Sequence, residues 1–216
     1  MSWRQNWGMI DLRVLIHRLF MSSPAPLEPP LSDYERFRRV VIVAQQSACN
    51  FGYFRGAYSV KDDDSPSDYD DIRARVTNNF LDVGVLEWVK LFYRREQHAW
   101  QQYIPAAQRD AFKAGLLAAV GLSESEWDAY VDSFREYRDK FIAHLDSKRV
   151  MSPPMLDIAI SALAYYMQYL DDNDPFGETM EEYQFDMRRL VELSFTTAVA
   201  FMRREGLPPA SCAAPA

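Results

Sequence analysis

Residues 123–145 read SESEWDAYVDSFREYRDKFIAHL, and this pattern is typical of an amphipathic helix. Ser123 and Glu126 form a capping box, in which each side chain accepts a hydrogen bond from the other residue's backbone N–H. At about 100° per residue, the apolar positions then fall within roughly 60° of one line, while Glu136 and Asp139 point away from it. These positions are Trp127, Tyr130, Val131, Phe134, Phe141 and Leu145. One face of the helix is therefore predicted to pack into a core.

Capping signals and proline positions predict helices on both sides of this stretch. A capping box at residues 32–35 opens the first, and Gly121 ends the third. Gly84, inside the second helix, is tolerated there and lets another backbone approach. The further helices are expected at residues 33–54, from between Asp70 and Val76 to about His98, at 105–119, at 154–170, and from a cap at Thr179 to just before Gly206. No segment alternates as a strand does, so we expect an all-α bundle of about six helices.

The chain has 216 residues, of which 48% are hydrophobic, and this is enough for one well-buried domain. We expect that domain at residues 32–205, after an N-terminal arm and proline-rich linker at 1–31 and before a disordered tail at 206–216. Residues 1–20 have two interpretations. They form an accessory arm, or they extend upstream of a reading frame that begins at Met21.

Composition excludes several classes of protein. A net charge of −7 argues against a general coat for nucleic acid, so any RNA contact must be local. Cys49 and Cys212 fit neither a disulfide framework nor a zinc site, which favours a reducing cytoplasm. The sequence has no run of eighteen apolar residues, so it predicts no membrane span. Phosphate-binding loops, zinc-protease motifs and nucleophile elbows do not occur, and we expect no metal or other cofactor.

Arg138 and His144 are the residues of this first stretch that suggest chemistry. On the helical wheel Arg138 lies about 40° from Phe134, inside the apolar face, and His144 lies about 80° away on the other side. A buried guanidinium needs an anion, so Arg138 either pairs with a carboxylate of another helix or lines a polar cleft. His144 can transfer protons near neutral pH. On a straight helix the two differ by about 120° and 9 Å, so reaching one phosphate requires long side-chain reach, a distorted last turn or a partner subunit.

An arginine, a polar residue beside it and a histidine after a gap of five residues, late in a helix, resemble the motif of the HEPN superfamily. The flanking sequences YRDKFIAHLD at 137–146 and FLDVGVLEWVKLF at 80–92 are most similar to HEPN proteins of the AbiU abortive-infection type. The resemblance covers roughly residues 33–204. It implies a helical bundle, a homodimer whose two motifs share a cleft, and metal-independent cleavage of RNA. It also implies a role in phage defence or as a toxin with an antitoxin protein.

Under this hypothesis three residues are catalytic: Arg138, His144 and Asp139. Arg138 holds phosphate oxygens, His144 acts as base or acid, and Asp139 orients a group or tunes His144. Lys140 and Lys148 are expected to bind RNA, because residues 135–149 carry five basic and three acidic side chains. The alternative for this segment is an ordinary helix surface with ion pairs.

Two other interpretations of Arg138 and His144 remain. The chain is a non-catalytic HEPN module whose cleft binds RNA, a nucleotide or a protein. Or Arg138 simply pairs with a buried acid and His144 caps its helix.

Three weaker signals lie outside the motif. His98 is expected to complement the dipole at the end of the second helix. Two acidic segments, 61–71 and 171–182, are expected to be solvated loops. The second of them resembles a calcium loop, but Phe176 and Tyr183 occupy positions where calcium requires oxygen ligands.

Overall fold

The computed structural model describes residues 31–60, 68–94, 96, 98–142, 154–173, 176, 183 and 185–204, without the side chains of 68–72, 141, 142 and 204. Every regular element within these residues is a helix, so the prediction of an all-α bundle is confirmed. The chain divides into two units, Met1–Ser32 and Asp33–Ala216, and the helices among the described residues belong to the second. Nearly all of the predicted arm, most of the first acidic loop and the predicted tail lie outside the described residues.

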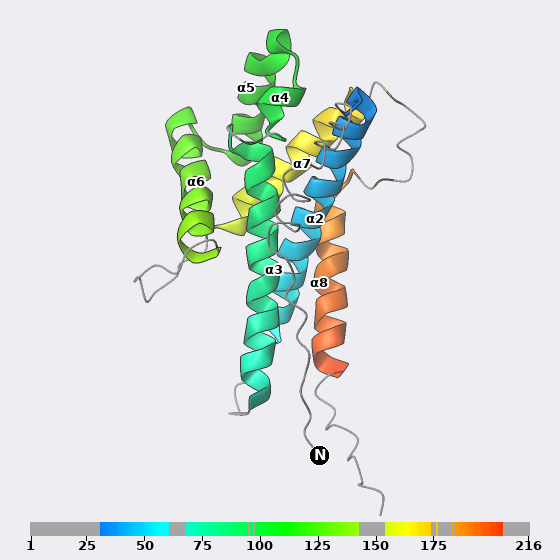
Figure 1. Ribbon diagram of the computed structural model, residues 1–216, viewed down its shortest axis with the longest axis vertical. Coiled ribbons are helices and arrows are strands. Elements are labelled where there is room, and N and C mark those ends of the chain that lie inside the picture. Colours follow the sequence, from blue (N-terminus) through cyan, green and yellow to red (C-terminus); the bar gives the residue numbers. More distant parts are fainter. Residues whose placement is uncertain are drawn as a thin grey trace, which may run out of the picture. The chain divides into compact units, whose positions relative to one another are not determined.

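The helices follow one another along the chain in the order shown in Figure 1. They are α2 (Asp33–Ser59), α3 (Asp68–Phe92), α4 (Trp100–Tyr103), α5 (Arg109–Val120), α6 (Glu124–Tyr137), α7 (Leu156–Asp172) and α8 (Met187–Arg204). A 3₁₀ turn (Ala106–Gln108) precedes α5, and a π-helical turn (Arg138–Ile142) follows α6. Six of the seven α-helices correspond to predicted ones, whereas the short α4 is an addition.

Small residues let α2 lie close to its neighbours α8 and α3, which run beside it in Figure 1. A Cβ at Gly56 would lie 2.4 Å from the carbonyl oxygen of Phe195 on α8. A Cβ at Gly84 on α3 would lie 2.7 Å from the ring of Phe51 on α2. The backbone approach predicted at Gly84 is therefore wrong in its partner, because the ring of Phe51 fills the space. Ser47 adds a hydrogen bond from its hydroxyl to the Gly84 carbonyl, at 3.0 Å.

An aromatic cluster fixes α6 on α3. Trp88 of α3 is fully buried, and its ring centroid lies 4.2 Å from that of Phe134 and 5.9 Å from that of Trp127, both on α6. The indole N–H of Trp88 donates to the carbonyl of Ala159 on α7 at 3.2 Å, and this hydrogen bond links α7 to α3 and α6. The predicted apolar face of residues 127–134 is thus the inner face of α6. Packing of this face against the core therefore fixes the position of the end of α6.

The sequence signals that predicted the start of α6 and the end of α5 are confirmed. Glu126 donates its N–H to the Ser123 hydroxyl oxygen, and the Ser123 N–H donates to the Glu126 carboxylate, so the capping box of α6 is complete. Gly121 ends α5 with a φ of 69°, in the left-handed region that glycine adopts without strain.

The predicted start of the last helix and the predicted end of the second helix are wrong. The last helix begins at Met187 and not at Thr179, because the carboxylate of Asp186 caps it by accepting the backbone N–H of Arg189 at 3.0 Å. Helix α3 ends at Phe92, short of His98, where the sequence turns to the polar run RREQH. That run offers no apolar side chain to continue the buried face of the helix.

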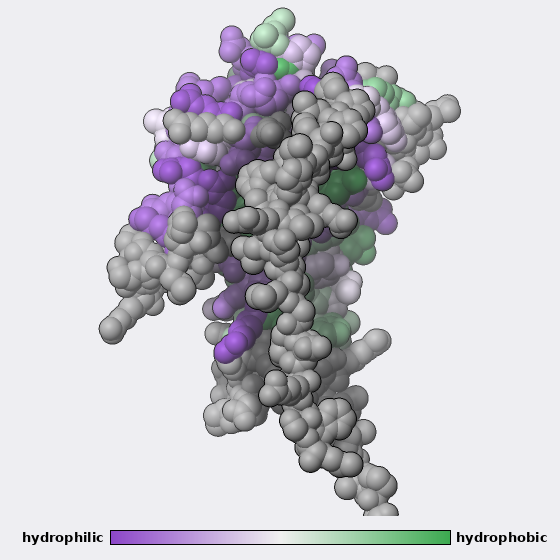
Figure 2. Space-filling model, viewed as in Figure 1, coloured by the Kyte–Doolittle hydropathy of each residue, from purple (hydrophilic) through white to green (hydrophobic). Residues whose placement is uncertain are grey.

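The surface of the described residues is uneven in polarity. Hydrophilic residues dominate over α6 in Figure 2, whereas hydrophobic ones reach the surface near α8. On α8 the side chains of Leu193, Phe195 and Phe201 are exposed. Among the described residues no helix combines the length and the apolar character that crossing a bilayer requires.

Candidate functional site

Arg138 stands where the regular helix α6 gives way to the π-helical turn Arg138–Ile142. The prediction of a regular helix is therefore wrong at Arg138–Ile142, and the rest of the predicted helix, to Leu145, lies outside the described residues. A π-helix closes its hydrogen bonds one residue further along the chain than an α-helix and turns less per residue. The angle predicted between Arg138 and His144 no longer applies, since one of the anticipated distortions is present. His144 and Lys148 themselves lie outside the described residues.

The guanidinium of Arg138 is held by two carboxylates and an aromatic ring. Its Nη1 donates to Glu96 Oε1 at 2.7 Å, and its Nε donates to Asp139 Oδ1 at 2.8 Å. The ring of Tyr93 lies 5.8 Å from the guanidinium carbon. The expectation that Arg138 needs a carboxylate partner is thus met, although Glu96 belongs to the turn after α3 and not to a helix.

These contacts determine the electrostatics of Arg138. Partial burial, which leaves 21% of the side chain exposed, by itself lowers the pKa of the guanidinium. The hydrogen bonds to Asp139 and Glu96 outweigh that effect and raise the pKa above its usual value. Arg138 is therefore a permanent cation whose charge the protein already balances in part.

Asp139 lies between two arginines, because its second oxygen also lies 3.5 Å from Nη1 of Arg135. Asp139 therefore holds Arg138 and also belongs to a run of ion pairs along the end of α6. Lys140, predicted to bind RNA, pairs with Glu136 one helical turn earlier. Each described basic side chain of residues 135–149 thus has an acidic partner, as the ion-pair alternative predicted.

Tyr137 anchors the end of α6 to α3. Its hydroxyl donates to Asp82 Oδ1 at 2.9 Å, and the Tyr137 side chain is buried. Burial raises the pKa of the Asp82 carboxyl, and the hydrogen bond from Tyr137 opposes the shift. This contact precedes the π-helical turn directly, so it sets the position from which Arg138 projects.

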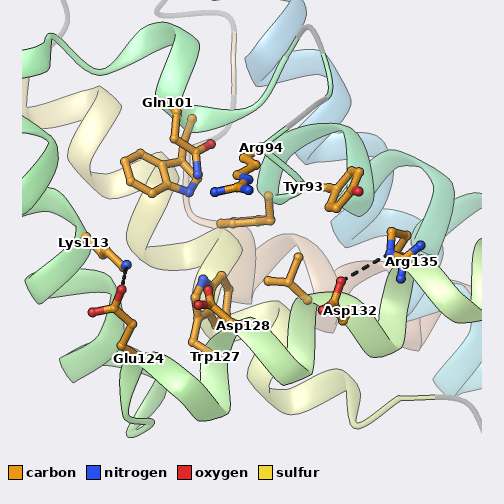
Figure 3. A pocket seen from close by; sticks show the side chains of 12 residues that line it. Tyr93, Arg94, Gln101, Lys113, Glu124, Trp127, Asp128, Asp132 and Arg135 are labelled. Atoms are coloured by element: carbon orange, nitrogen blue, oxygen red, sulfur yellow. Dashed lines mark hydrogen bonds and ion pairs between the residues drawn. The ribbon is translucent and has the colours of Figure 1, made fainter.

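A cleft of about 680 Å³ lies beside this group, between the end of α3, α4, α5 and α6 (Figure 3). Its lining combines aromatic side chains with charged ones of both signs. The lining residues are Phe92, Tyr93, Arg94, Trp100, Gln101, Lys113, Glu124, Trp127, Asp128, Val131, Asp132 and Arg135. Tyr93 lines the cleft and also contacts Arg138, because the Arg138 guanidinium lies over the Tyr93 ring.

Several polar groups of the cleft lack a partner among the described residues. The indole Nε1 of Trp100 and the amide Oε1 of Gln101 are both buried without a hydrogen bond. Arg94 is exposed and forms no ion pair within that part of the chain, although Lys113 pairs with Glu124 and Arg135 with Asp132. In Figure 3 the guanidinium of Arg94 projects into the cleft near Gln101.

This cleft was not predicted from the sequence, where its signal was the mixed polar and aromatic run at residues 94–103. His98 of the same run does not complement a helix dipole as predicted. It lies beyond the end of α3, where burial, with Arg39 and Lys90 nearby, lowers its pKa. A group that complements a helix C-terminus would show the opposite shift.

Comparison of the chain with protein-family models, with curated proteins and with solved structures gives no match. The side chains around Arg138 and in the cleft are therefore what the structure offers for a functional proposal.

Proposed function

We propose that this chain is a metal-independent endoribonuclease of the HEPN type, which acts on RNA as a homodimer. The observation that carries the proposal is the environment of Arg138. This guanidinium is part-buried at a widened helical turn, and two of its N–H groups bind carboxylate oxygens. Oxygen anions already occupy this position, so a phosphate suits it equally well in charge and hydrogen bonding.

Arg138 also keeps donors for a substrate. A guanidinium has five N–H donors in a planar fork, and the two hydrogen bonds described above leave the others unused among the described residues. A phosphate oxygen can bind at this free edge while Asp139 holds Nε and fixes the plane of the fork. Asp139 would therefore act as a positioning residue, and Lys140 and Lys148 would contact neighbouring phosphates.

The cleavage step needs three groups around one phosphate. A base removes the proton of the 2′-hydroxyl, the 2′-oxygen attacks phosphorus, and the bond to the 5′-oxygen breaks as an acid protonates that oxygen. Arg138 would balance the negative charge that grows on the phosphate oxygens. His144 would serve as base or acid, and His144 of the second copy would supply the other proton transfer.

The biological setting follows from the same family resemblance. We place the ribonuclease in the cytoplasm, in phage defence or as the toxin of a toxin–antitoxin pair with an antitoxin protein as partner. Two cysteines without a disulfide pattern support a reducing compartment.

A second candidate is a non-catalytic module that binds RNA, a nucleotide or a protein. The pairing of Arg138 with both Glu96 and Asp139 favours it, because a guanidinium already balanced by two carboxylates offers less net charge to a transition state. It differs from the first proposal in a measurable way, since it predicts binding without turnover.

Cleavage of single-stranded and structured RNAs in EDTA tests the two candidates. The full-length protein is compared with Arg138→Ala and His144→Ala variants, each checked for folding and for dimer content. Arg189→Ala, an exposed arginine near the start of α8, is the matched control for loss of one positive charge.

The ribonuclease proposal predicts cleavage by the wild type and the control and loss of it in both motif variants. Cleavage that survives Arg138→Ala would overturn the assigned site. RNA binding that depends on Arg138, with no turnover by the wild type, would favour the binding module.

A further inference from the structure

The cleft beside Tyr93 contains a hydrogen-bond donor and an acceptor on adjacent residues, and neither has a partner among the described residues. The donor is Trp100 Nε1, on a side chain only 4% exposed, and the acceptor is Gln101 Oε1. A buried polar group without a hydrogen bond costs about 1–3 kcal/mol. Both atoms are shielded from water, so a ligand reaches them only when neighbouring side chains move, and it then replaces no existing hydrogen bond.

A planar ring with a donor next to an acceptor on one edge suits this pair. Each nucleobase has such an edge, on which a carbonyl oxygen or ring nitrogen accepts and a neighbouring N–H donates. Phe92, Trp100 and Trp127 supply the apolar and aromatic part of the cleft, on which a flat ring can lie. A cleft of about 680 Å³ is within the range of pockets that enclose small organic ligands.

The charges of the cleft indicate what the ring carries. Arg94 is the cation of the lining without an acidic partner among the described residues, and its planar fork is suited to a phosphate. Inorganic phosphate alone would satisfy Arg94 and leave Trp100 and Gln101 unpaired. A ligand that combines a nucleobase with one phosphate satisfies all three.

We propose that this cleft binds a nucleotide, with the edge of the base on Trp100 and Gln101 and the phosphate on Arg94. The lining side chains must move slightly to admit it, and the exposed, unpaired Arg94 is able to do so. The nucleotide comes from one of two sources, a free mononucleotide or one unit of an RNA strand. In the second case the inference rests on the proposed ribonuclease function, and the cleft selects the base next to the phosphate bound by Arg138, to which Tyr93 connects it.

Binding to the full-length protein tests the inference without any need for turnover. The probes are the four ribonucleoside 5′-monophosphates, adenosine, inorganic phosphate and a 2′-O-methyl tetranucleotide that the 2′-hydroxyl reaction cannot cleave. Affinities come from calorimetry. The indole N–H signal of Trp100, one of five tryptophans, is followed by ¹⁵N NMR and assigned with Trp100→Phe.

The variants separate the two ends of the ligand. Arg94→Ala is expected to weaken binding of a mononucleotide about tenfold and to leave adenosine unaffected, because a hydrogen bond to a charged group is lost. Gln101→Leu is expected to weaken binding of both ligands. Arg189→Ala, the matched control on α8, is expected to change neither.

The inference is supported by binding that depends on Arg94 and Gln101 and that shifts the Trp100 indole signal. If a mononucleotide binds in this way, the cleft takes a free nucleotide. If only the tetranucleotide does so, the cleft takes one unit of an RNA strand. It is overturned if no probe binds, if inorganic phosphate binds as well as a mononucleotide does, or if the two variants bind like the wild type. Failure of RNA cleavage would refute the ribonuclease proposal and leave these binding results unchanged.

Discussion

Glu96 balances part of the charge of Arg138 beside the free edge at which a phosphate would bind, so removing the charge of Glu96 should strengthen RNA binding. In Glu96→Gln the side chain keeps its length but loses the carboxylate that accepts from Arg138 Nη1 at 2.7 Å. Asp139 still holds Nε in this variant. Arg138 therefore stays oriented. Less free energy is needed than in the wild type for its Nη1 and its unused N–H groups to bind RNA.

The size of the effect follows from the exposure of the pair. Sheltered hydrogen bonds between charged groups contribute about 1.5–3 kcal/mol and exposed ion pairs less than about 1 kcal/mol. The Arg138 and Glu96 side chains are 21% and 33% exposed, which is intermediate. We take about 1 kcal/mol, which corresponds to about fivefold tighter binding of RNA. The same substitution should lower the free energy of unfolding by a similar amount.

Fluorescence anisotropy with the 2′-O-methyl tetranucleotide, at one fixed salt concentration, measures this effect. Glu192→Gln on α8 makes the same change in net charge away from Arg138, and the affinity of Glu96→Gln is compared with it. If Glu96→Gln binds no more tightly than this control, Glu96 does not compete with RNA. If it binds as weakly as Arg138→Ala, Glu96 orients the guanidinium, and the competition argument is wrong.

Three further predictions concern stability. Gly56→Ala should destabilise the protein by about 1–3 kcal/mol in urea unfolding, because the new Cβ would lie 2.4 Å from the Phe195 carbonyl oxygen; unchanged stability would show that α2 and α8 separate freely. Tyr166→Phe should raise the free energy of unfolding by about 1 kcal/mol, since the fully buried Tyr166 hydroxyl has no partner among the described residues; a loss would reveal a partner. Burial raises the pKa of Asp82, so its carboxyl favours folding below the ordinary value of 3.8, and that contribution is lost as pH rises through the folded pKa. Asp82→Asn, which can still accept from Tyr137, should therefore raise the urea midpoint at pH 7 and not at pH 3; equal effects at both pH values would contradict this.

The parts of the fold that local chemistry determines could be predicted from the sequence. The capping box of Ser123 and Glu126, the left-handed Gly121 and the apolar face of α6 each depend on residues close together in the chain. The wrong helix ends arise where the local signal was ambiguous. Thr179 and Asp186 are both acceptable caps, and only the packed position of α8 decides between them.

The site was predictable only in part, because its partners come from distant segments. The sequence indicated that Arg138 needed an anion, but Glu96 is 42 positions away in the chain and lies in a turn that the helical pattern did not reveal. The cleft has the same origin. Trp100 and Gln101 belong to a four-residue helix, too short for any periodic signal, and they meet α5 and α6 only in the folded chain.

The π-helical turn connects these observations. A regular α6 would continue its apolar face past Tyr137 and place Arg138 within that face, as the helical wheel predicted. The widened turn instead begins at Arg138, directly after Tyr137 is anchored to Asp82. Such a turn costs stability relative to a regular helix, and the contacts of Arg138 with Glu96, Asp139 and Tyr93 offset that cost. The same contacts hold a guanidinium with unused donors beside a cleft whose lining includes Arg94, an arginine without an acidic partner among the described residues. Tyr93 contacts the Arg138 guanidinium and also lines the cleft with Arg94, so under the proposed function the two arginines would bind neighbouring phosphates of one RNA strand.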